Sequence, residues 1–250
     1  MAREGWAAAC RRGLVQLLFP RSCLVCEALL DDRWAALACS SCLANIARLP
    51  AGRCDRCGYP GAGTPCETCH DLDPGIVRAR SVCWADDPVA RTLLHAFKYD
   101  GWPALASTMA PGLARLSPDD ASPCERWLLP VPLAAGRRRE RGYNQAELLA
   151  DALARLWRCT LVRDALVRVR DTPSQTRLTR SDRFANVAGA IRVHTTQLPR
   201  GRAHCVLVDD VMTTGATLNA CAAVLRAAGI EHIATVTYGR ARHHPATTTA

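Results

Sequence analysis

The sequence predicts an α/β protein, in which a parallel sheet with helices on both faces follows a small cysteine-rich metal module. Two observations support this prediction. Four Cys-x2-Cys pairs, which use eight of the 14 cysteines, stand in series between Cys23 and Cys69. From Ile76 onward, short apolar runs alternate with segments of helical period. Strands that alternate with helices form parallel sheets covered on both faces.

Composition places the chain among globular proteins without a membrane span. It has 250 residues, 49% of them hydrophobic, and no apolar run long enough to cross a bilayer. The N-terminal residues lack the features of a secretory signal, so we expect a cytoplasmic protein. The net charge of +9 favours anionic partners such as phosphates or nucleic acid. Lys98 is the only lysine among 32 basic residues, as a GC-rich coding sequence would produce, and this weakens the inference from charge.

Changes in composition divide the chain into four parts. We expect a short amphipathic helix over residues 1–22 and the cysteine module over residues 23–72. An Asp-Pro-Gly sequence at 73–75 has the chemistry of a turn and marks the boundary with an α/β domain over residues 76–240. Residues 241–250 are expected to form a flexible tail.

Each Cys-x2-Cys pair places two thiolates on one tight turn, where both can bind a single tetrahedral zinc ion. Eight thiolates suffice for two sites with protein ligands only, which is typical of structural zinc. The simplest pairing is local and gives two sites: Cys23, Cys26, Cys39 and Cys42, then Cys54, Cys57, Cys66 and Cys69. The alternatives are a cross-braced pairing, a single site, and redox-active pairs, although the last need a thioredoxin-like context that the sequence lacks.

Strands and helices are expected to alternate in the second part of the chain. Apolar runs predict strands at residues 127–133, 161–169, 205–208 and 233–238. Helical periods predict helices at residues 144–157 and 217–228. Gly229 stands at the C′ position of the second helix, where glycine is favoured. A parallel sheet binds its ligand at the carboxyl ends of its strands, and the functional site is expected there.

The most informative segment follows the predicted strand at 205–208. Asp209 and Asp210 come first. A loop of threonines and small residues follows and leads into a helix; the loop residues are Thr213, Thr214, Gly215, Ala216 and Thr217. In such a loop, backbone N–H groups converge on one anion at the start of the helix. Neighbouring carboxylates suit the hydroxyl groups of a sugar, or a magnesium ion. The segment predicts a sugar-5-phosphate site, and a cluster of helix-capping residues is the alternative.

The segment from Cys205 to Thr217 resembles the phosphoribosyl pyrophosphate motif of type I phosphoribosyltransferases. The whole chain is similar to the ComF family, whose members join an N-terminal cysteine zinc ribbon to such a domain. Further matching segments are Phe97-Lys98-Tyr99, Pro130-Val131-Pro132-Leu133, Arg141-Gly142-Tyr143-Asn144-Gln145, and Gln175 with Leu178, Arg183 and Asn186. The resemblance implies a type I phosphoribosyltransferase-like sheet.

The resemblance also implies a role for each part of the site. Asp209 and Asp210 would act in catalysis by holding the ribose hydroxyl groups, and residues 213–217 would hold the 5-phosphate. Pyrophosphate, with Mg2+, would lie against the segment after an earlier strand, close to these residues: Leu133, Ala134, Arg137 and Arg141. A mobile loop over residues 170–186 would close over the site with two arginines: Arg180 and Arg183.

The function implied is the displacement of magnesium pyrophosphate from C1 of the sugar by a base or an amine, which would make the protein a phosphoribosyltransferase. The ComF resemblance suggests a part in DNA uptake during natural transformation, with single-stranded DNA and the uptake machinery as partners. The alternative is a non-catalytic module that senses the ligand and binds single-stranded DNA or protein.

Overall fold

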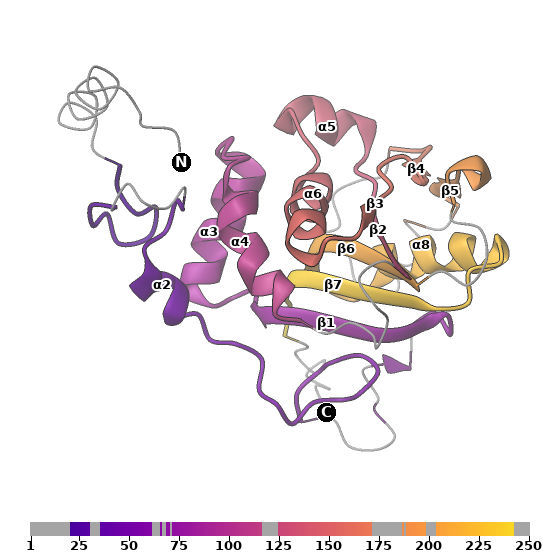
Figure 1. Ribbon diagram of the computed structural model, residues 1–250, viewed down its shortest axis with the longest axis horizontal. Coiled ribbons are helices and arrows are strands. Elements are labelled where there is room, and N and C mark those ends of the chain that lie inside the picture. The colour runs from indigo at the N-terminus through magenta and orange to yellow at the C-terminus, as the bar shows by residue number, and fades with distance from the viewer. Residues whose placement is uncertain are drawn as a thin grey trace, which may run out of the picture.

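A parallel sheet lies at the centre of the molecule (Figure 1). The computed structural model describes residues 21–30, 36–61, 66, 69–70, 72–116, 125–171, 187, 189–198 and 204–242. The strands of the sheet are β1 (Ile76–Trp84), β2 (Arg126–Pro130), β3 (Thr160–Leu161), β6 (His204–Met212) and β7 (Ile233–Arg240). They run in the order β1-β7-β6-β2-β3, and every pair is parallel. The predicted fold class is confirmed.

Helices cover both faces of this sheet. One face carries α3 (Pro88–Tyr99), α4 (Leu105–Ala114) and α6 (Gln145–Trp157) (Figure 1). The other carries α8 (Ala216–Ala227) and a two-stranded antiparallel sheet of β4 (Leu166–Arg168) and β5 (Ile191–Val193). Three short helices complete the described elements: α2 (Ser40–Ala44), α5 (Ala135–Arg141) and η4 (Thr195–Gln197). Alternate residues of β6 enter the two cores, because successive side chains of a strand point to opposite faces.

The two predicted helices are confirmed, and their ends have local causes. At the start of α6, the side chain of Asn144 accepts a hydrogen bond from the backbone N–H of Ala146, at 3.1 Å. The apolar positions Leu149 and Leu153 of this helix are fully buried. Beyond the end of α8, Gly229 has a φ of +91°, a conformation that other residues rarely adopt.

All four predicted strands have different bounds in the structure. The strand expected at 233–238 continues to Arg240. The strand expected at 127–133 ends at Pro130. The N–H of Val131 still donates to the carbonyl of Val208, at 3.0 Å, but Pro132 after it has no N–H group to continue the ladder. The strand expected at 161–169 is two strands, β3 and β4, in different sheets, because Arg163 and Asp164 form an exposed turn between them. The strand expected at 205–208 continues to Met212, so the two aspartates lie within β6 rather than after it.

The cysteine module packs against the sheet. Cys23 and Cys42 belong to the core on the face of α3 and α4, whereas Cys57 belongs to the core on the face of α8. Between these two contacts, the chain follows the outer edge of β1, where the N–H of Leu49 donates to the carbonyl of Val82 at 3.3 Å (Figure 1). The module therefore covers the free edge of β1 and contributes to both cores.

Several predictions fall on residues outside the described ranges. They concern residues 1–20 of the helix expected over 1–22, residues 172–186 of the loop expected over 170–186, with Arg180 and Arg183, and residues 243–250 of the tail expected over 241–250. None of the helices in the described part of the chain has the length and hydropathy that a membrane crossing requires.

Candidate functional site

A cavity of about 390 Å³ opens at the carboxyl ends of β2 and β6. Seven residues of the predicted site line it: Leu133, Arg137, Arg141, Asp209, Asp210, Thr213 and Thr217. Four others belong to the same segments without lining it: Ala134, Thr214, Gly215 and Ala216. The structure therefore brings together the segments after two neighbouring strands, as the sequence predicts for a parallel sheet.

The cavity exists because neighbouring strands differ in length. β2 ends at Pro130, opposite Val208, whereas β6 continues to Met212. Beyond Val208, the residues of β6 pair with β7 on one side, and on the other side they border the cavity. Asp209 and Asp210 are thus presented on an open strand edge at the centre of the sheet.

The two aspartates occupy opposite faces of the sheet, because they are consecutive in one strand. Asp210 lies on the face of α3, where its Oδ1 atom is 3.0 Å from Nζ of Lys98. Asp209 lies on the face of α8, where the charge of Arg168 on β4 acts on it. Its Oδ1 atom also accepts a hydrogen bond from the backbone N–H of Asp210, at 2.8 Å. Each carboxylate therefore has a cation on its own face of the sheet.

Asp209 is a weak acid in this setting. Burial, and after it the charge of Asp210, raises the pKa of Asp209 from 3.8 to about 7, although Lys98 and Arg168 act in the opposite direction. Burial, followed by the charge of Arg137, lowers the pKa of Arg168. A carboxyl group that titrates near neutral pH can either accept a hydrogen bond from a hydroxyl group or donate one to an oxygen atom.

The loop from β6 to α8 is tightly packed around Gly215. This residue precedes the helix with a φ of +82°, which favours glycine. A Cβ atom there would lie 3.1 Å from Cε of Met212 and 3.2 Å from Cδ2 of Leu72. The first turn of α8 contains no acidic residue, so its N–H groups and its dipole favour an anion.

Two site residues were missed at the sequence level. Lys98 belongs to a segment that resembles the family, but its pairing with Asp210 is a tertiary contact between distant parts of the chain. The signal that could have found Lys98 is its status as the only lysine. Arg168 has no comparable signal, because it is one of many arginines in the sequence.

One wall of the cavity joins two of the segments that resemble the family. The hydroxyl of Tyr143 and the side-chain amide of Gln145 both donate to the carbonyl of Phe97, at 2.8 and 3.1 Å. These bonds hold the last turn of α3, which carries Lys98, against the start of α6. The Arg141 guanidinium donates to Oε1 of Gln145 at 3.1 Å and continues this wall.

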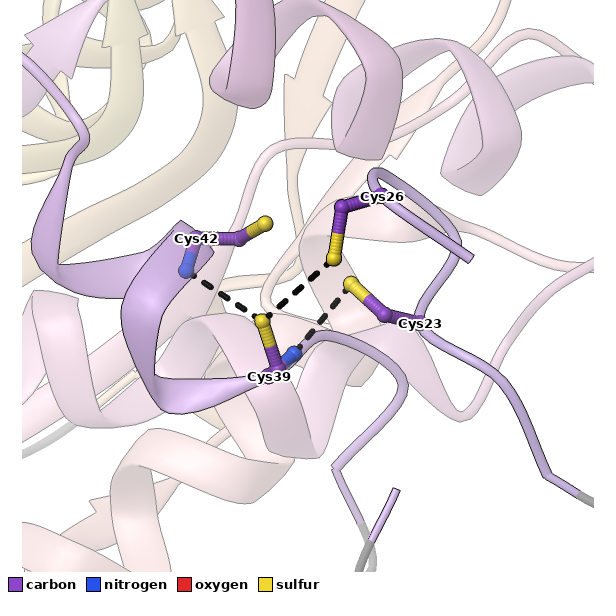
Figure 2. Close-up of side chains that lie close together, drawn as sticks. All are labelled: Cys23, Cys26, Cys39 and Cys42. Carbon is purple, nitrogen blue, oxygen red and sulfur yellow. Dashed lines mark hydrogen bonds between the residues drawn. The ribbon is translucent and has the colours of Figure 1, made fainter. Parts of the chain in front are cut away.

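The first cysteine cluster has the geometry of a tetrahedral metal site (Figure 2). The Sγ atoms of Cys23, Cys26, Cys39 and Cys42 all lie within 4.8 Å of one another, and those of Cys26 and Cys39 are 3.7 Å apart. Zinc–sulfur bonds of about 2.3 Å place tetrahedral sulfurs roughly 3.8 Å apart, whereas a disulfide needs about 2 Å. Backbone N–H groups of Cys39 and Cys42 also donate to cluster sulfurs, at 3.3 and 3.4 Å.

The second cluster has the same form. The Sγ atoms of Cys57 and Cys66 are 3.6 Å apart, and those of Cys54 and Cys69 are 3.9 Å apart. The exposed His70 is not a member of the cluster. The local pairing of cysteines is confirmed, and both clusters are consistent with structural zinc.

One thiol in each cluster is acidified by backbone donors. Burial opposes the ionisation of Cys23, but N–H groups of Cys26 and Cys39 outweigh it and lower the pKa of Cys23 to about 6. Burial likewise opposes the ionisation of Cys54, but the backbone N–H groups of Cys57 and Arg56 outweigh it and lower the pKa of Cys54 to about 7. In the same clusters, burial and then the neighbouring thiols raise the pKa of Cys42 and Cys69, so the four thiols of a cluster ionise together only with a bound cation.

The second cluster also contacts the loop of the cavity. The buried guanidinium of Arg240 donates to the carbonyl of Cys57 at 3.1 Å and contacts the sulfur of Met212. Downstream of the cluster, the N–H of Asp73 donates to Oδ1 of Asn219 on α8, at 3.0 Å. The metal module and the cavity loop therefore share a packed boundary.

Comparison with known proteins identifies the family. Residues 141–247 match the phosphoribosyl transferase domain, and residues 14–73 match the double zinc ribbon domain. The chain is 32% identical over 220 residues to the DNA utilization protein YhgH of Salmonella typhimurium, a match that covers 84% of this chain and 92% of that protein. It is 31% identical over 207 residues to competence protein F of Haemophilus influenzae, covering 78% and 86%.

A more distant relative extends this similarity to another group of bacteria. Competence protein ComFC of Bacillus subtilis is 26% identical over 223 residues, covering 81% of this chain and 88% of that protein. The domain matches over residues 14–73 and 141–247, the two cysteine clusters and the sheet order agree with one another. The chain therefore belongs to the ComF family, with a phosphoribosyltransferase domain behind an N-terminal double zinc ribbon.

Proposed function

We propose that the cavity binds phosphoribosyl pyrophosphate with Mg2+. The ribose hydroxyl groups donate to Asp209 and Asp210, and the 5-phosphate accepts hydrogen bonds from the N–H groups of residues 213–217. The pyrophosphate lies toward Arg137 and Arg141. The observation that carries this proposal is the aspartate pair on the open edge of β6, directly before an α8 N-terminus without acidic residues.

The reaction that this arrangement supports is the displacement of pyrophosphate from C1 of the ribose by a nucleophile. An oxocarbenium-like state forms as the C1–oxygen bond breaks, so catalysis depends on positioning and on cations that offset the charge of the leaving group. Asp209 or Asp210 would hold Mg2+, which would supply part of that charge when bound. Arg137 and Arg141 line the cavity and supply more. The protein is then a phosphoribosyltransferase.

Calorimetry tests the binding step. Phosphoribosyl pyrophosphate with Mg2+ is titrated into the wild type, Thr217→Val and Thr92→Val. The hydroxyl-bearing side chain of Thr217 lines the cavity, so its loss is expected to weaken binding about tenfold. Thr92 donates to Pro88 on the exposed side of α3, and its variant is expected to bind as the wild type does. A wild type that does not bind, or two variants with equal affinity, would overturn the assignment.

We also propose a role for the protein in DNA uptake or DNA utilization, with single-stranded DNA and the uptake machinery as partners. The names of the relatives, which include a DNA utilization protein and two competence proteins, support this role. The net charge of +9 and the arginines of α5 favour an anionic partner. A cytoplasmic location would fit both roles.

Salt dependence tests the contact with DNA. The affinity for a single-stranded oligonucleotide is expected to fall steeply as salt rises from about 50 to 200 mM. Arg139→Gln removes one exposed cation of α5 and is expected to reduce the slope by roughly 1. An affinity that does not respond to salt would contradict the electrostatic contact.

A further inference from the structure

We propose that Lys98 is a ligand-binding residue of the cavity and that an arginine cannot replace its ammonium group. This inference rests on the proposed function and adds a residue to it. When the ribose hydroxyl groups donate to Asp210, Lys98 keeps one N–H group on that carboxylate and donates the others to phosphoryl oxygens of the ligand. Before the ligand binds, Nζ of Lys98 lies 3.0 Å from Oδ1 of Asp210.

The composition of the chain sets Lys98 apart. Lys98 is the only lysine among 32 basic residues, so a bias toward arginine has acted at the other basic positions. Apart from His95 with Asp100, the other ion pairs found among the described residues use arginine, as in Arg242 with Asp86. A lysine that persists against such a bias indicates a position where the compact ammonium group itself is needed.

Hydrogen bonds on the neighbouring backbone hold Lys98 at the wall of the cavity. The carbonyl of the preceding residue, the fully buried Phe97, accepts hydrogen bonds from Tyr143 and Gln145 on the α6 side. These bonds fix the end of α3 at the wall of the cavity. The side chains of Lys98 and Asp210 are only 20% and 11% exposed, so the pair is far better shielded from water than an ordinary surface ion pair.

The side-chain cations of lysine and arginine differ in shape. Guanidinium is a planar fork that binds both oxygens of a carboxylate, whereas ammonium is a point charge with three donors. An arginine at position 98 would occupy both oxygens of Asp210 and compete with the ribose hydroxyl groups. A lysine leaves one oxygen for the sugar and retains two donors for the ligand. On the other face of the sheet, the charge of Arg168 acts on Asp209.

Chemical protection tests this inference on the native side chain. Because Lys98 is the only lysine, acylation by acetic anhydride, followed by peptide mass spectrometry, reports on its ε-amine without interference. The variant Arg155→Lys adds a reference amine on the exposed face of α6, where the arginine side chain is 75% exposed. Phosphoribosyl pyrophosphate with Mg2+ is expected to slow acylation of Lys98 about tenfold or more and to leave the reference amine unchanged.

Calorimetry of Lys98→Arg and Lys98→Met completes the test, with thermal melting to confirm that both variants are folded. Lys98→Arg is expected to lose about tenfold in affinity although its charge is kept, and Lys98→Met is expected to lose more. If the wild type binds the ligand while Lys98 is acylated at an unchanged rate, or if Lys98→Arg binds equally well, the inference is overturned and the proposed function stands. A wild type that does not bind overturns both.

Discussion

The two cysteine clusters have the same internal geometry but different neighbours. The first packs against α4, where the N–H of Leu37 donates to Oγ1 of Thr108 at 3.0 Å, and its Cys26 is exposed. The second lies against the loop of the cavity. Arg240, which binds its backbone, contacts the sulfur of Met212, and Leu72 packs beside Gly215. The first cluster therefore stabilises one face of the fold, whereas the second also supports the candidate site.

The largest difference is expected when one cysteine of each cluster is replaced. Cys57→Ser should release the second metal, loosen the loop and weaken the binding of phosphoribosyl pyrophosphate by about tenfold or more. Cys26→Ser should release the first metal and leave that affinity within about twofold. Metal content by mass spectrometry and affinity by calorimetry measure both effects. Equal losses of affinity would mean that the clusters do not differ in this way.

Removal of Arg240 should have the next largest effect. Arg240 is 2% exposed and acts on the thiols of the second cluster, so its charge is balanced best when those thiols are ionised and metal-bound. Arg240→Met is expected to lower the free energy of unfolding by about 3 kcal/mol in the metal-loaded protein. The matched control is Arg242→Met, which removes an exposed ion pair with Asp86 and should cost less than about 1 kcal/mol. Denaturant unfolding compares the two.

Substitutions at two glycines distinguish the cost of backbone strain from the effect of contact with the cysteine module. Both Gly215 and Gly229 have positive φ, but only at Gly215 would a Cβ atom meet neighbours, namely Met212 and Leu72. Gly229→Ala should cost about 1 kcal/mol of stability and leave ligand affinity unchanged. Gly215→Ala should cost about 2 kcal/mol and weaken binding as well. If both variants bind the ligand equally, the contact with Leu72 does not matter to the site.

The smallest effect concerns Asp209, which shares its face of the sheet with the second cluster. Folding raises the pKa of Asp209 from 3.8 to about 7, so the folded protein binds this proton more tightly than the unfolded chain does. The stability that the proton supplies is present below pH 3.8 and is lost as the pH rises from there to about 7. Asp209→Asn should therefore raise the melting temperature by several degrees at pH 8 and by about half as much at pH 5.5. A gain in melting temperature that does not change with pH would show that burial of the charged carboxylate is not its cause.

Local patterns were enough to predict much of the fold. The spacing of the Cys-x2-Cys pairs predicted both clusters, because each cluster closes within a short stretch of chain. The apolar period of α6 and Gly229 after α8 predicted those helices. The single strand expected at 161–169 was wrong, since the apolar run hid the turn at Arg163 and Asp164.

The parts of the site that were missed depend on tertiary structure. Lys98 and Arg168 come from α3 and β4, far in sequence from the aspartates that they face. Their approach is decided by the order of strands and by the hydrogen bonds on Phe97, neither of which leaves a local pattern. The path of the cysteine module along β1 was missed for the same reason, because it reflects how an open strand edge is covered.

The sheet order has a consequence for the synthesis of the chain. β1, the first strand of the sheet to leave the ribosome, pairs with β7, the last one. Arg240, which closes over the second cluster, stands at the very end of β7. Neither β1 nor that cluster can reach its final packing until β7 has been synthesised, so the amino-terminal module must wait for the last strand of the sheet. A premature stop before Ile233 would therefore harm the amino-terminal module as well as the carboxyl-terminal strand.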